Sequence, residues 1–282
     1  MSHVVGRLGA FALVLAGTFG TAYAVGERLP GHTHSAQDGH THTGTGMSTP
    51  VPPGFESGGY QLVTDHAHAG MATFHLRDEA GSDVTEFTEA HGSLLHVVVI
   101  RPDLSDFQHV HPTIGDDGSW DVTLPAPGQW HLVFDSTPTG APGPVVVSAN
   151  IDDETPVATV PLPPADDTVD VAGLVVTRDG FTFSVANADG SMLMGLEPYL
   201  GQAAHLVAMR QGDLAYTHLH PSEGMTGMFM FGTGITEAGT YRLFLQFGYQ
   251  GDVLTVPFTV VVPGTLPPPA RRWNTSTSSS PA

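Results

Sequence analysis

Two short stretches of the sequence place histidines one residue apart, directly before a proline. Residues 107–112 read FQHVHP and residues 216–221 read YTHLHP, so an aromatic–x–His–x–His–Pro pattern occurs twice. In a β-strand, residues i and i+2 project from the same face, about 6.6 Å apart along the chain. Each pattern therefore sets two imidazole rings side by side, and imidazole nitrogens are ligands for transition-metal ions.

A third histidine joins each pair if the preceding strand folds back as a hairpin. In the first copy, residues 94–101 and 107–112 are strand-like, and Pro102 suits the second position of the turn between them. An even-numbered loop places His96 opposite His111, whereas an odd one moves His96 to the other face. With the even loop, each copy gathers three imidazoles on one face of its hairpin: His96, His109 and His111, and then His205, His218 and His220.

These two clusters suit a transition-metal ion. Three histidines from adjacent strands are a known ligand set for Zn²⁺ and Cu²⁺. The chain has no cysteine, which excludes thiolate ligands, disulfides and cysteine nucleophiles. The residues alone leave copper and zinc both open. The competing interpretation is structural, because His96 shares its face with Val98 and Ile100 and fits a core histidine bonded to a carbonyl group.

Two further histidines lie within the first copy. His91 precedes Gly92 at a strand start and is a candidate fourth ligand of the first cluster, although the second copy has Leu200 at this position. His131 follows Trp130 on a strand, and Arg242 replaces it in the second copy. We therefore expect His131 at the surface.

The remaining candidate donors are methionines and flexible histidines. The second copy carries a set of methionines that the first lacks: Met209, Met225, Met228 and Met230. Thioethers suit Cu⁺, but methionine more often fills gaps in an apolar core. Histidine pairs at 32–34, 40–42 and 66–68 can chelate a metal loosely or reflect low-complexity composition alone.

The charge of the chain argues against nucleic acid as a partner. The 282 residues carry a formal net charge of −19, and all nine basic residues are arginines. Such a surface repels phosphate backbones and attracts cations. The expected partner is a transition-metal ion, and the sequence points to no particular protein partner.

The chain is a tandem duplication. The histidines of the first cluster recur 109 residues later, as do Phe74 at Phe183 and Gly92 at Gly201. Short β-rich runs follow one another at intervals of roughly 8–12 residues, the spacing of a β-sandwich. The sequence predicts an all-β fold with two tandem immunoglobulin-like β-sandwiches, at residues 58–151 and 168–263.

An apolar segment precedes the two predicted sandwiches. Residues 8–25 are uncharged, so residues 1–27 are predicted as a transmembrane anchor or as a signal peptide cleaved after residue 24. Both alternatives place the rest outside the cytoplasm, in a single-pass cell-membrane protein or in a secreted one. Three segments lack the composition of a core: the His-rich linker 28–57, the linker 152–167 and the tail 264–282.

The stretch LLHVVVIRPDLSDFQHVHP, residues 94–112, followed by GSWDVTLPAPGQWHLVF, residues 118–134, resembles a family of bacterial extracytoplasmic proteins. These are actinobacterial-type, membrane-anchored proteins with tandem His-x-His-Pro β-sandwich modules. The second copy looks like the companion module of such proteins. The resemblance covers both domains, implies heavy-metal or copper handling, and marks the six clustered histidines as the family's positions.

The sequence favours a metal-binding protein of the cell envelope, with copper at His-x-His-Pro hairpin sites. The alternative is an adhesion or scaffold protein whose histidines are structural, because function cannot be read from a fold alone. We expect no enzymatic activity, since no carboxylate lies next to the histidine pairs to serve as a general base.

Overall fold

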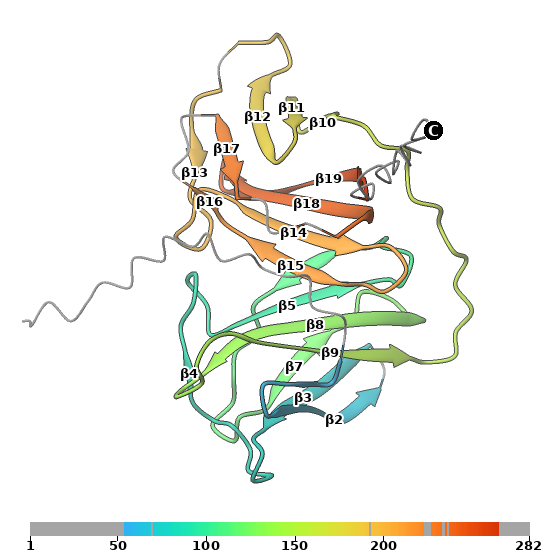
Figure 1. The fold of residues 1–282 in the computed structure, drawn as a ribbon, viewed down its shortest axis with the longest axis vertical. Coiled ribbons are helices and arrows are strands. Elements are labelled where there is room, and N and C mark those ends of the chain that lie inside the picture. Colours follow the sequence, from blue (N-terminus) through green and yellow to red (C-terminus); the bar gives the residue numbers. More distant parts are fainter. Residues whose placement is uncertain are drawn as a thin grey trace, which may run out of the picture. The chain divides into compact units, whose positions relative to one another are not determined.

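A computed structural model describes residues 54–264, apart from residues 69, 192, 223–226, 233, 234 and 236. Regular structure in these residues consists of β-strands, which form four sheets in two tandem sandwich domains (Figure 1). The all-β prediction is therefore confirmed. The segment predicted as an anchor or signal peptide, residues 1–27, lies outside the described residues. Within the described residues, no helix is long and apolar enough to span a bilayer.

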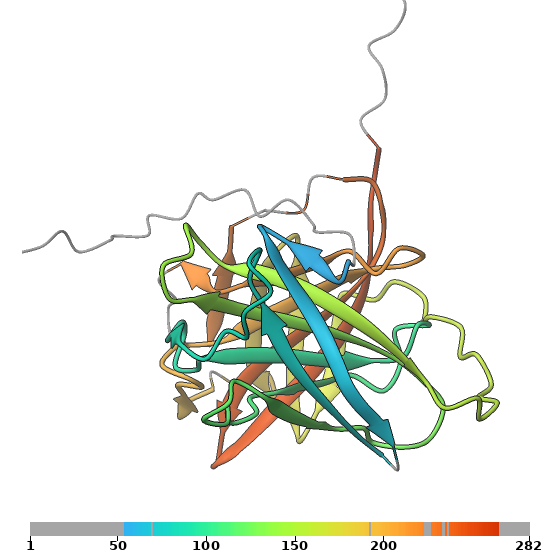
Figure 2. The ribbon, with the colours of Figure 1, turned by 90° about the horizontal axis from the view of Figure 1, so that it is seen from below.

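The first domain contains strands β1 to β9. One sheet has the order β1-β2-β3-β7, and the other has the order β4-β8-β5-β6 with β9 paired to β8 (Figure 2). The pair β1–β2 includes residues 56–57, which lie in the segment predicted as a linker. The strand bounds are β1 Glu56–Ser57, β2 Tyr60–His68, β3 Met71–Arg77, β4 Phe87–Thr88, β5 Leu95–Ile100, β6 Gln108–Val110, β7 Trp120–Thr123, β8 Gln129–Pro138 and β9 Val145–Asp152.

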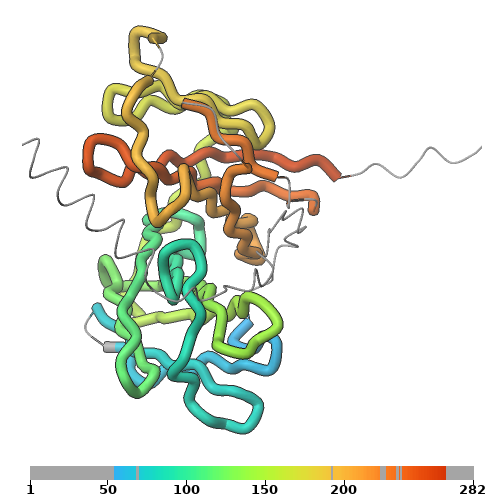
Figure 3. The backbone as a smooth tube through the Cα atoms, turned by 90° about the vertical axis from the view of Figure 1, so that its left-hand side faces the viewer, coloured from blue at the N-terminus to red at the C-terminus, as the bar shows by residue number. Residues whose placement is uncertain are grey.

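The second domain repeats this arrangement in strands β10 to β19. Its sheets have the orders β10-β11-β12-β17-β16 and β13-β18-β14-β15, with β19 paired to β18. Figure 3 follows the backbone of this domain, coloured from yellow to red. The order matches that of the first domain, with the short strand β16 added. The strand bounds are β10 Thr168–Val171, β11 Leu174–Asp179, β12 Thr182–Asn187, β13 Leu196–Glu197, β14 His205–Arg210, β15 Tyr216–Leu219, β16 Pro221–Ser222, β17 Met228–Phe231, β18 Gly239–Tyr249 and β19 Asp252–Val262.

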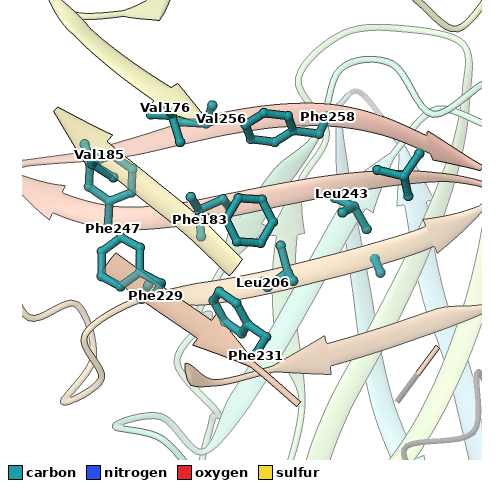
Figure 4. Packing of buried hydrophobic residues seen from close by; sticks show 14 of the residues in the cluster. Val176, Phe183, Val185, Leu206, Phe229, Phe231, Leu243, Phe247, Val256 and Phe258 are labelled. Carbon is teal, nitrogen blue, oxygen red and sulfur yellow. The ribbon is translucent and has the colours of Figure 1, made fainter. Parts of the chain in front are cut away.

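Each sandwich encloses an apolar core between its two sheets. Strand β7 shows how the sequence produces this, since Trp120 and Val122 are buried while Asp121 and Thr123 are exposed. In the second domain, aromatic side chains from both sheets meet at the centre (Figure 4). Phe183 lies at the equivalent position to Phe74, and both are fully buried. The duplication therefore preserves the core as well as the histidine pattern.

The hairpins that carry the histidines have the predicted register. In the first domain, Val98 on β5 pairs with His109 on β6. In the second, Val207 on β14 pairs with His218 on β15. Continuing each register by two residues sets His96 opposite His111 and, in the second domain, the first histidine opposite the third. The even-loop prediction is thus confirmed, and all three rings lie on one face of each hairpin.

That face is not the sandwich interior. Strand β5 is buried on both faces: Val97 and Val99 belong to the core of the first domain, whereas Val98 and Ile100 belong to a third apolar cluster. This third cluster joins the two domains, which fall within one compact unit. Its buried members are Val98, Ile100, Leu104, Val133, Val207, Met209, Tyr216 and Phe244. The histidines therefore lie on the outer faces of the sheets, at the interface between the domains.

Candidate metal centre

In both domains the three histidines bring one ring nitrogen each to a common point. In the first triad, Nδ1 of His96 lies 3.2 Å from Nε2 of His109 and 3.1 Å from Nε2 of His111. In the second, Nδ1 of His205 lies 3.1 Å from Nε2 of both His218 and His220. Within each triad the three candidate ligand atoms are all within 4.8 Å of one another. Nitrogens bound about 2.0–2.1 Å from a tetrahedral ion lie about 3.3–3.4 Å apart, so each triad has room for one metal ion.

A backbone carbonyl orients the first histidine of each triad. Nε2–H of His96 donates to the carbonyl oxygen of Ala90 at 3.0 Å, and Nε2–H of His205 donates to that of Tyr199 at 2.9 Å. A neutral imidazole carries one N–H, so Nδ1 of both rings keeps its lone pair. This arrangement contains the carbonyl bond expected of a structural histidine. It also leaves the opposite nitrogen directed at the other two rings.

The carbonyls that orient these rings belong to tight two-residue turns. In the first domain, Ala90 and Ser93 exchange two backbone hydrogen bonds around His91 and Gly92, whose φ angles are 53° and 77°. Two successive positive φ angles define a type I′ hairpin turn, in which glycine is favoured at the second central residue. In the second domain, Leu200 and Gly201 have φ angles of 49° and 73°. The same turn therefore positions the first histidine in both copies.

The middle histidine of each triad is contacted by the other domain. Nδ1–H of His109 donates to Oε1 of Gln246 at 2.8 Å, and the amide nitrogen of Gln246 donates to Oγ1 of Thr255 at 3.0 Å. The second bond sets the amide so that its oxygen faces His109. In the second domain, Nδ1 of His218 lies 3.8 Å from Oδ2 of Asp135. The hydrogen bond to Gln246 orients His109 in the way that is usual for a metal-ligating histidine.

Burial favours the neutral form of five of these imidazoles. It lowers the pKa of His111 and His205 to about 4, with neighbouring histidines as a further cause for both. Burial also lowers the pKa of three other rings, those of His109, His218 and His220. The same desolvation raises the pKa of Asp135, against the opposing effect of His96 and the hydroxyl of Tyr216. Neutral imidazole is the form that binds a metal ion.

His91 lies against the second triad rather than completing the first. Its ring stacks on that of His220, with centroids 3.7 Å apart and an interplanar angle of 28°, whereas the ring of His96 is 6.4 Å away. The two-residue turn carries His91 across to the second domain. The equivalent turn of the second domain brings Tyr199 to 6.1 Å from the ring of His111. The sequence predicts His91 as a candidate fourth ligand of the triad in its own domain, and it does not indicate that the ring of His91 reaches the second domain.

The prediction that His131 lies at the surface is wrong. Its side chain is fully buried, and Nδ1 contacts Oδ1 of Asn150 at 2.7 Å. It lies on β8 two residues before Val133, which packs in the third apolar cluster. Residues i and i+2 of a strand share one face, so His131 belongs to the face that the second domain covers.

The methionines of the second copy divide between the two sheets. Met209 is fully buried in the third apolar cluster, as the packing interpretation expected. Met228 and Met230 lie on β17, which belongs to the sheet opposite the triad, and Met230 is 46% exposed. Met225 and the histidines at 32–34 and 40–42 lie outside the described residues. His66 lies on β2 and is exposed, and His68 ends that strand.

Sequence reasoning did not single out the residues that orient the middle histidines. Asp135 pairs with His96 on the neighbouring strand, and Gln246 pairs with His205 in the same way. These two residues occupy equivalent positions of the duplication, after GQWHLVF and AGTYRLFL. Their equivalent positions, each opposite the first histidine of a triad, are the feature of the sequence that could have identified them. Their partners in the other domain could not be read from it.

The comparisons with known proteins give the chain a family. A model described as "Domain of unknown function (DUF8832)" matches residues 55–151 and again residues 168–264. The chain therefore belongs to this family and contains two tandem copies of its domain, each a β-sandwich with a buried histidine triad. No curated protein matches the chain. Among solved structures, the chain is similar to one titled "Crystal structure of chicken CNTN1 FN1-FN3 domains", with 11% identity, a TM-score of 0.22, and coverage of 75% of this chain and 68% of that chain.

Proposed function

We propose that the protein is an extracytoplasmic metal-binding protein of the cell envelope and that its metal is copper. One observation carries the proposal. In the first triad, the N–H groups of His96 and His109 both point away from the centre, towards Ala90 and Gln246. The lone pairs of the facing nitrogens then meet at 3.2 Å. Two lone pairs repel at this distance unless a cation lies between them.

A metal ion relieves the repulsion between these lone pairs better than a proton does. Burial lowers the pKa of His109 and His111, so protonation at neutral pH is unfavourable. A metal ion can accept three nitrogens at once, whereas a proton joins only two. In the second triad, Nδ1 of His205 and Nε2 of His218 also face each other at 3.1 Å, and the carbonyl of Tyr199 keeps the lone pair of His205 on Nδ1.

The donor set favours copper, with zinc as the alternative. Imidazole is a borderline ligand that suits both metals, and Cu²⁺ binds more tightly than Zn²⁺ to a given set of nitrogen ligands. The triads contain no carboxylate or thiolate ligand that would favour Mg²⁺ or Ca²⁺, or a soft-metal cluster. The formal charge of −19 attracts cations of either kind to the surface.

Location and fold class are parts of the same proposal. The apolar run at residues 8–25 supports a membrane anchor or a cleaved signal peptide, so that the domains lie outside the cytoplasm. An immunoglobulin-like class is supported by the strand pairing. The pairs β3–β7 and β5–β8–β9 correspond to the B–E and C–F–G strands of that fold. We propose no enzymatic activity, because the carboxylate that contacts the triads among the described residues, that of Asp135, faces the ring of His218.

The second candidate function is a scaffold or adhesion protein with structural histidines. The carbonyl bonds to His96 and His205 favour it, because a buried polar group in a structural role needs such a partner. It leaves the converging nitrogens of the other two rings in each triad without a role.

Metal titration separates the two functions. The purified chain is titrated by calorimetry with Cu²⁺ and Zn²⁺, and with Cu⁺ under anaerobic conditions. Replacing His109 and His111 with alanine removes binding at the first triad, and replacing His218 and His220 removes it at the second. The control, His66→Ala, changes an exposed histidine outside both triads and leaves binding unchanged.

A second control addresses the histidines near the N-terminus. A variant with alanine at residues 32, 34, 40 and 42 retains the tight sites and loses only loose binding. If this variant instead abolished tight binding, the triads would not be the metal sites. A folded protein that binds none of the three ions would favour the scaffold function.

A further inference from the structure

The two triads lie against each other across the domain interface. The rings of His96 and His109 are each 5.1 Å from the ring of His218, and their distances to the ring of His205 are 6.4 Å and 6.1 Å. Within the first triad, the rings of His96 and His109 are 5.3 Å apart. Rings of different domains are thus as close as rings of one triad.

Each domain also places a polar group against the middle histidine of the other domain. Gln246, beside His205 on the neighbouring strand, accepts a hydrogen bond from His109 of the first domain. Asp135, beside His96 on the neighbouring strand, faces His218 of the second domain. The exchange is reciprocal, and it uses equivalent positions of the two copies. Neither triad has its full set of contacts within its own domain.

The two type I′ turns close the interface beside the triads. A Cβ atom added at Gly92 would lie 3.0 Å from the carbonyl oxygen of Leu200, in the equivalent turn of the other domain. The ring of His91 stacks on His220 at the same place. Close packing of this kind holds the two triads at a fixed separation.

We propose that the two triads act as one paired centre, which takes two monovalent copper ions across the domain interface. This inference rests on the proposed metal-binding function and adds to it the number, charge and interdependence of the ions. Each domain contributes three ligands to one ion and one orienting group to the other ion. The centre is complete only when the two domains are in contact.

Charge selects monovalent ions for a pair at this separation. The Coulomb energy scales with the product of the two charges, so two divalent ions repel each other four times as strongly as two monovalent ions. Among the described residues, Asp135 is the carboxylate that faces the triads. One carboxylate offsets much of the charge of two Cu⁺ ions and little of that of two Zn²⁺ ions. Neutral imidazoles in a buried site add no negative charge of their own.

Stoichiometry tests the pairing. The full chain is titrated with Cu⁺ under anaerobic conditions against a chromogenic chelator, and with Zn²⁺ in a parallel experiment. We expect two Cu⁺ ions per chain, the second bound about 100-fold more weakly than the first, and one tightly bound Zn²⁺ ion followed by a second that is weakened by several further powers of ten. Two Zn²⁺ ions of equal affinity would overturn the pairing and leave the metal-binding function intact. No binding of either metal would overturn both.

A cross-domain substitution tests the interdependence. In a chain whose second triad is removed by His218→Ala and His220→Ala, Gln246→Ala is expected to lower the Cu⁺ affinity of the first triad by 10–100-fold, the usual effect of losing a group that orients a ligand. Gln246→Glu keeps an acceptor for His109 and restores the affinity. The control, Gln250→Ala, changes an exposed glutamine of the same domain.

The rescue separates orientation from folding. If Gln246→Ala and Gln246→Glu both lower the affinity equally, the residue acts through the stability of its own domain. If neither changes the affinity of the first triad, the reciprocal contact has no role and the two sites are independent. Either result would overturn the pairing while the triads still bind metal.

Discussion

The substitution Gly92→Ala tests how closely the two domains pack, and Gly201→Ala in the equivalent turn is its control. Gly92 and Gly201 occupy equivalent positions in the two type I′ turns, with φ angles of 77° and 73°. Alanine at either position enters the left-handed region, which costs roughly 1–2 kcal/mol. The two substitutions differ in their surroundings. A Cβ at Gly92 lies 3.0–3.2 Å from backbone atoms of Leu200, whereas one at Gly201 has no atom within 4 Å.

The extra cost of Gly92→Ala follows from that contact. Backbone atoms cannot rotate away as a flexible side chain does, so the two turns must separate or the strain must remain. An added methyl in a well-packed region typically costs about 1–3 kcal/mol. For a protein with roughly 200 ordered residues, 1 kcal/mol lowers the thermal midpoint by about 2–4 °C. Gly92→Ala should therefore unfold about 2–12 °C below Gly201→Ala.

Differential scanning calorimetry of the two variants, without metal, measures this difference. The comparison cancels the backbone strain, because both variants carry the same left-handed alanine. Equal midpoints for the two variants would refute the close contact between the turns, and with it the fixed separation of the two triads. A lower midpoint for Gly201→Ala than for Gly92→Ala would also refute the close contact.

Three further outcomes follow from the packing and the charges. Because burial lowers the pKa of His111 and His205 to about 4, the metal-free folded chain binds fewer protons than the unfolded one between about pH 6.5 and 4. Its unfolding free energy should therefore decrease as the pH is lowered through this range, by about 1.4 kcal/mol per pH unit for each of the two histidines. Urea unfolding that does not depend on pH would contradict this expectation. Arg101→Ala should lower the unfolding free energy by about 2–4 kcal/mol, because the guanidinium of Arg101 is buried over Trp130 and donates to two backbone carbonyls. The loss should exceed that of Arg210→Ala, and equal thermal midpoints for the two variants would contradict this. Phe244→Ala removes an aromatic ring of the third apolar cluster and should cost about 3–5 kcal/mol in urea unfolding, whereas a loss below about 1 kcal/mol would mean that the domains do not pack there.

The triads could be predicted from sequence because strand geometry is local. The alternation of side chains places His109 and His111 on one face of their strand. An even-numbered loop then places His96 on the same face of the neighbouring strand, across from His111. Turn residues such as Pro102 indicate that loop without reference to the rest of the fold. The duplication then repeats the argument at the second hairpin. These inferences need only short-range steric rules, and the observed register agrees with them.

The domain interface could not be predicted in this way. Arg242 at the equivalent position of the second copy suggests a surface position for His131, and the neighbouring residues of its strand give no sign that a second domain buries it. Asp135 and Gln246 occupy ordinary strand positions, and their partners lie 83 and 137 residues away in the chain. Hydrophobic periodicity reports which face is buried and not what buries it. The sequence shows that Val98 and Ile100 form an apolar face, and it does not show that the second domain covers this face.

The separation of the two triads decides how many ions of each charge the centre holds. Rings of different triads are 5.1–6.4 Å apart. If two ions lay at the same separation as these rings, about 6 Å, an effective dielectric constant of about 20 would make two monovalent ions repel by about 3 kcal/mol and two divalent ions by about 11 kcal/mol. The second figure approaches the whole binding free energy of a nanomolar site, about 12 kcal/mol. A second Zn²⁺ should thus bind only weakly beside the first, whereas a second Cu⁺ loses about two powers of ten in affinity. Replacing Asp135 with asparagine removes the facing carboxylate and should weaken the second Cu⁺ further. Stepwise Cu⁺ constants that are identical in Asp135→Asn and the parent chain would show that charge does not govern the pair.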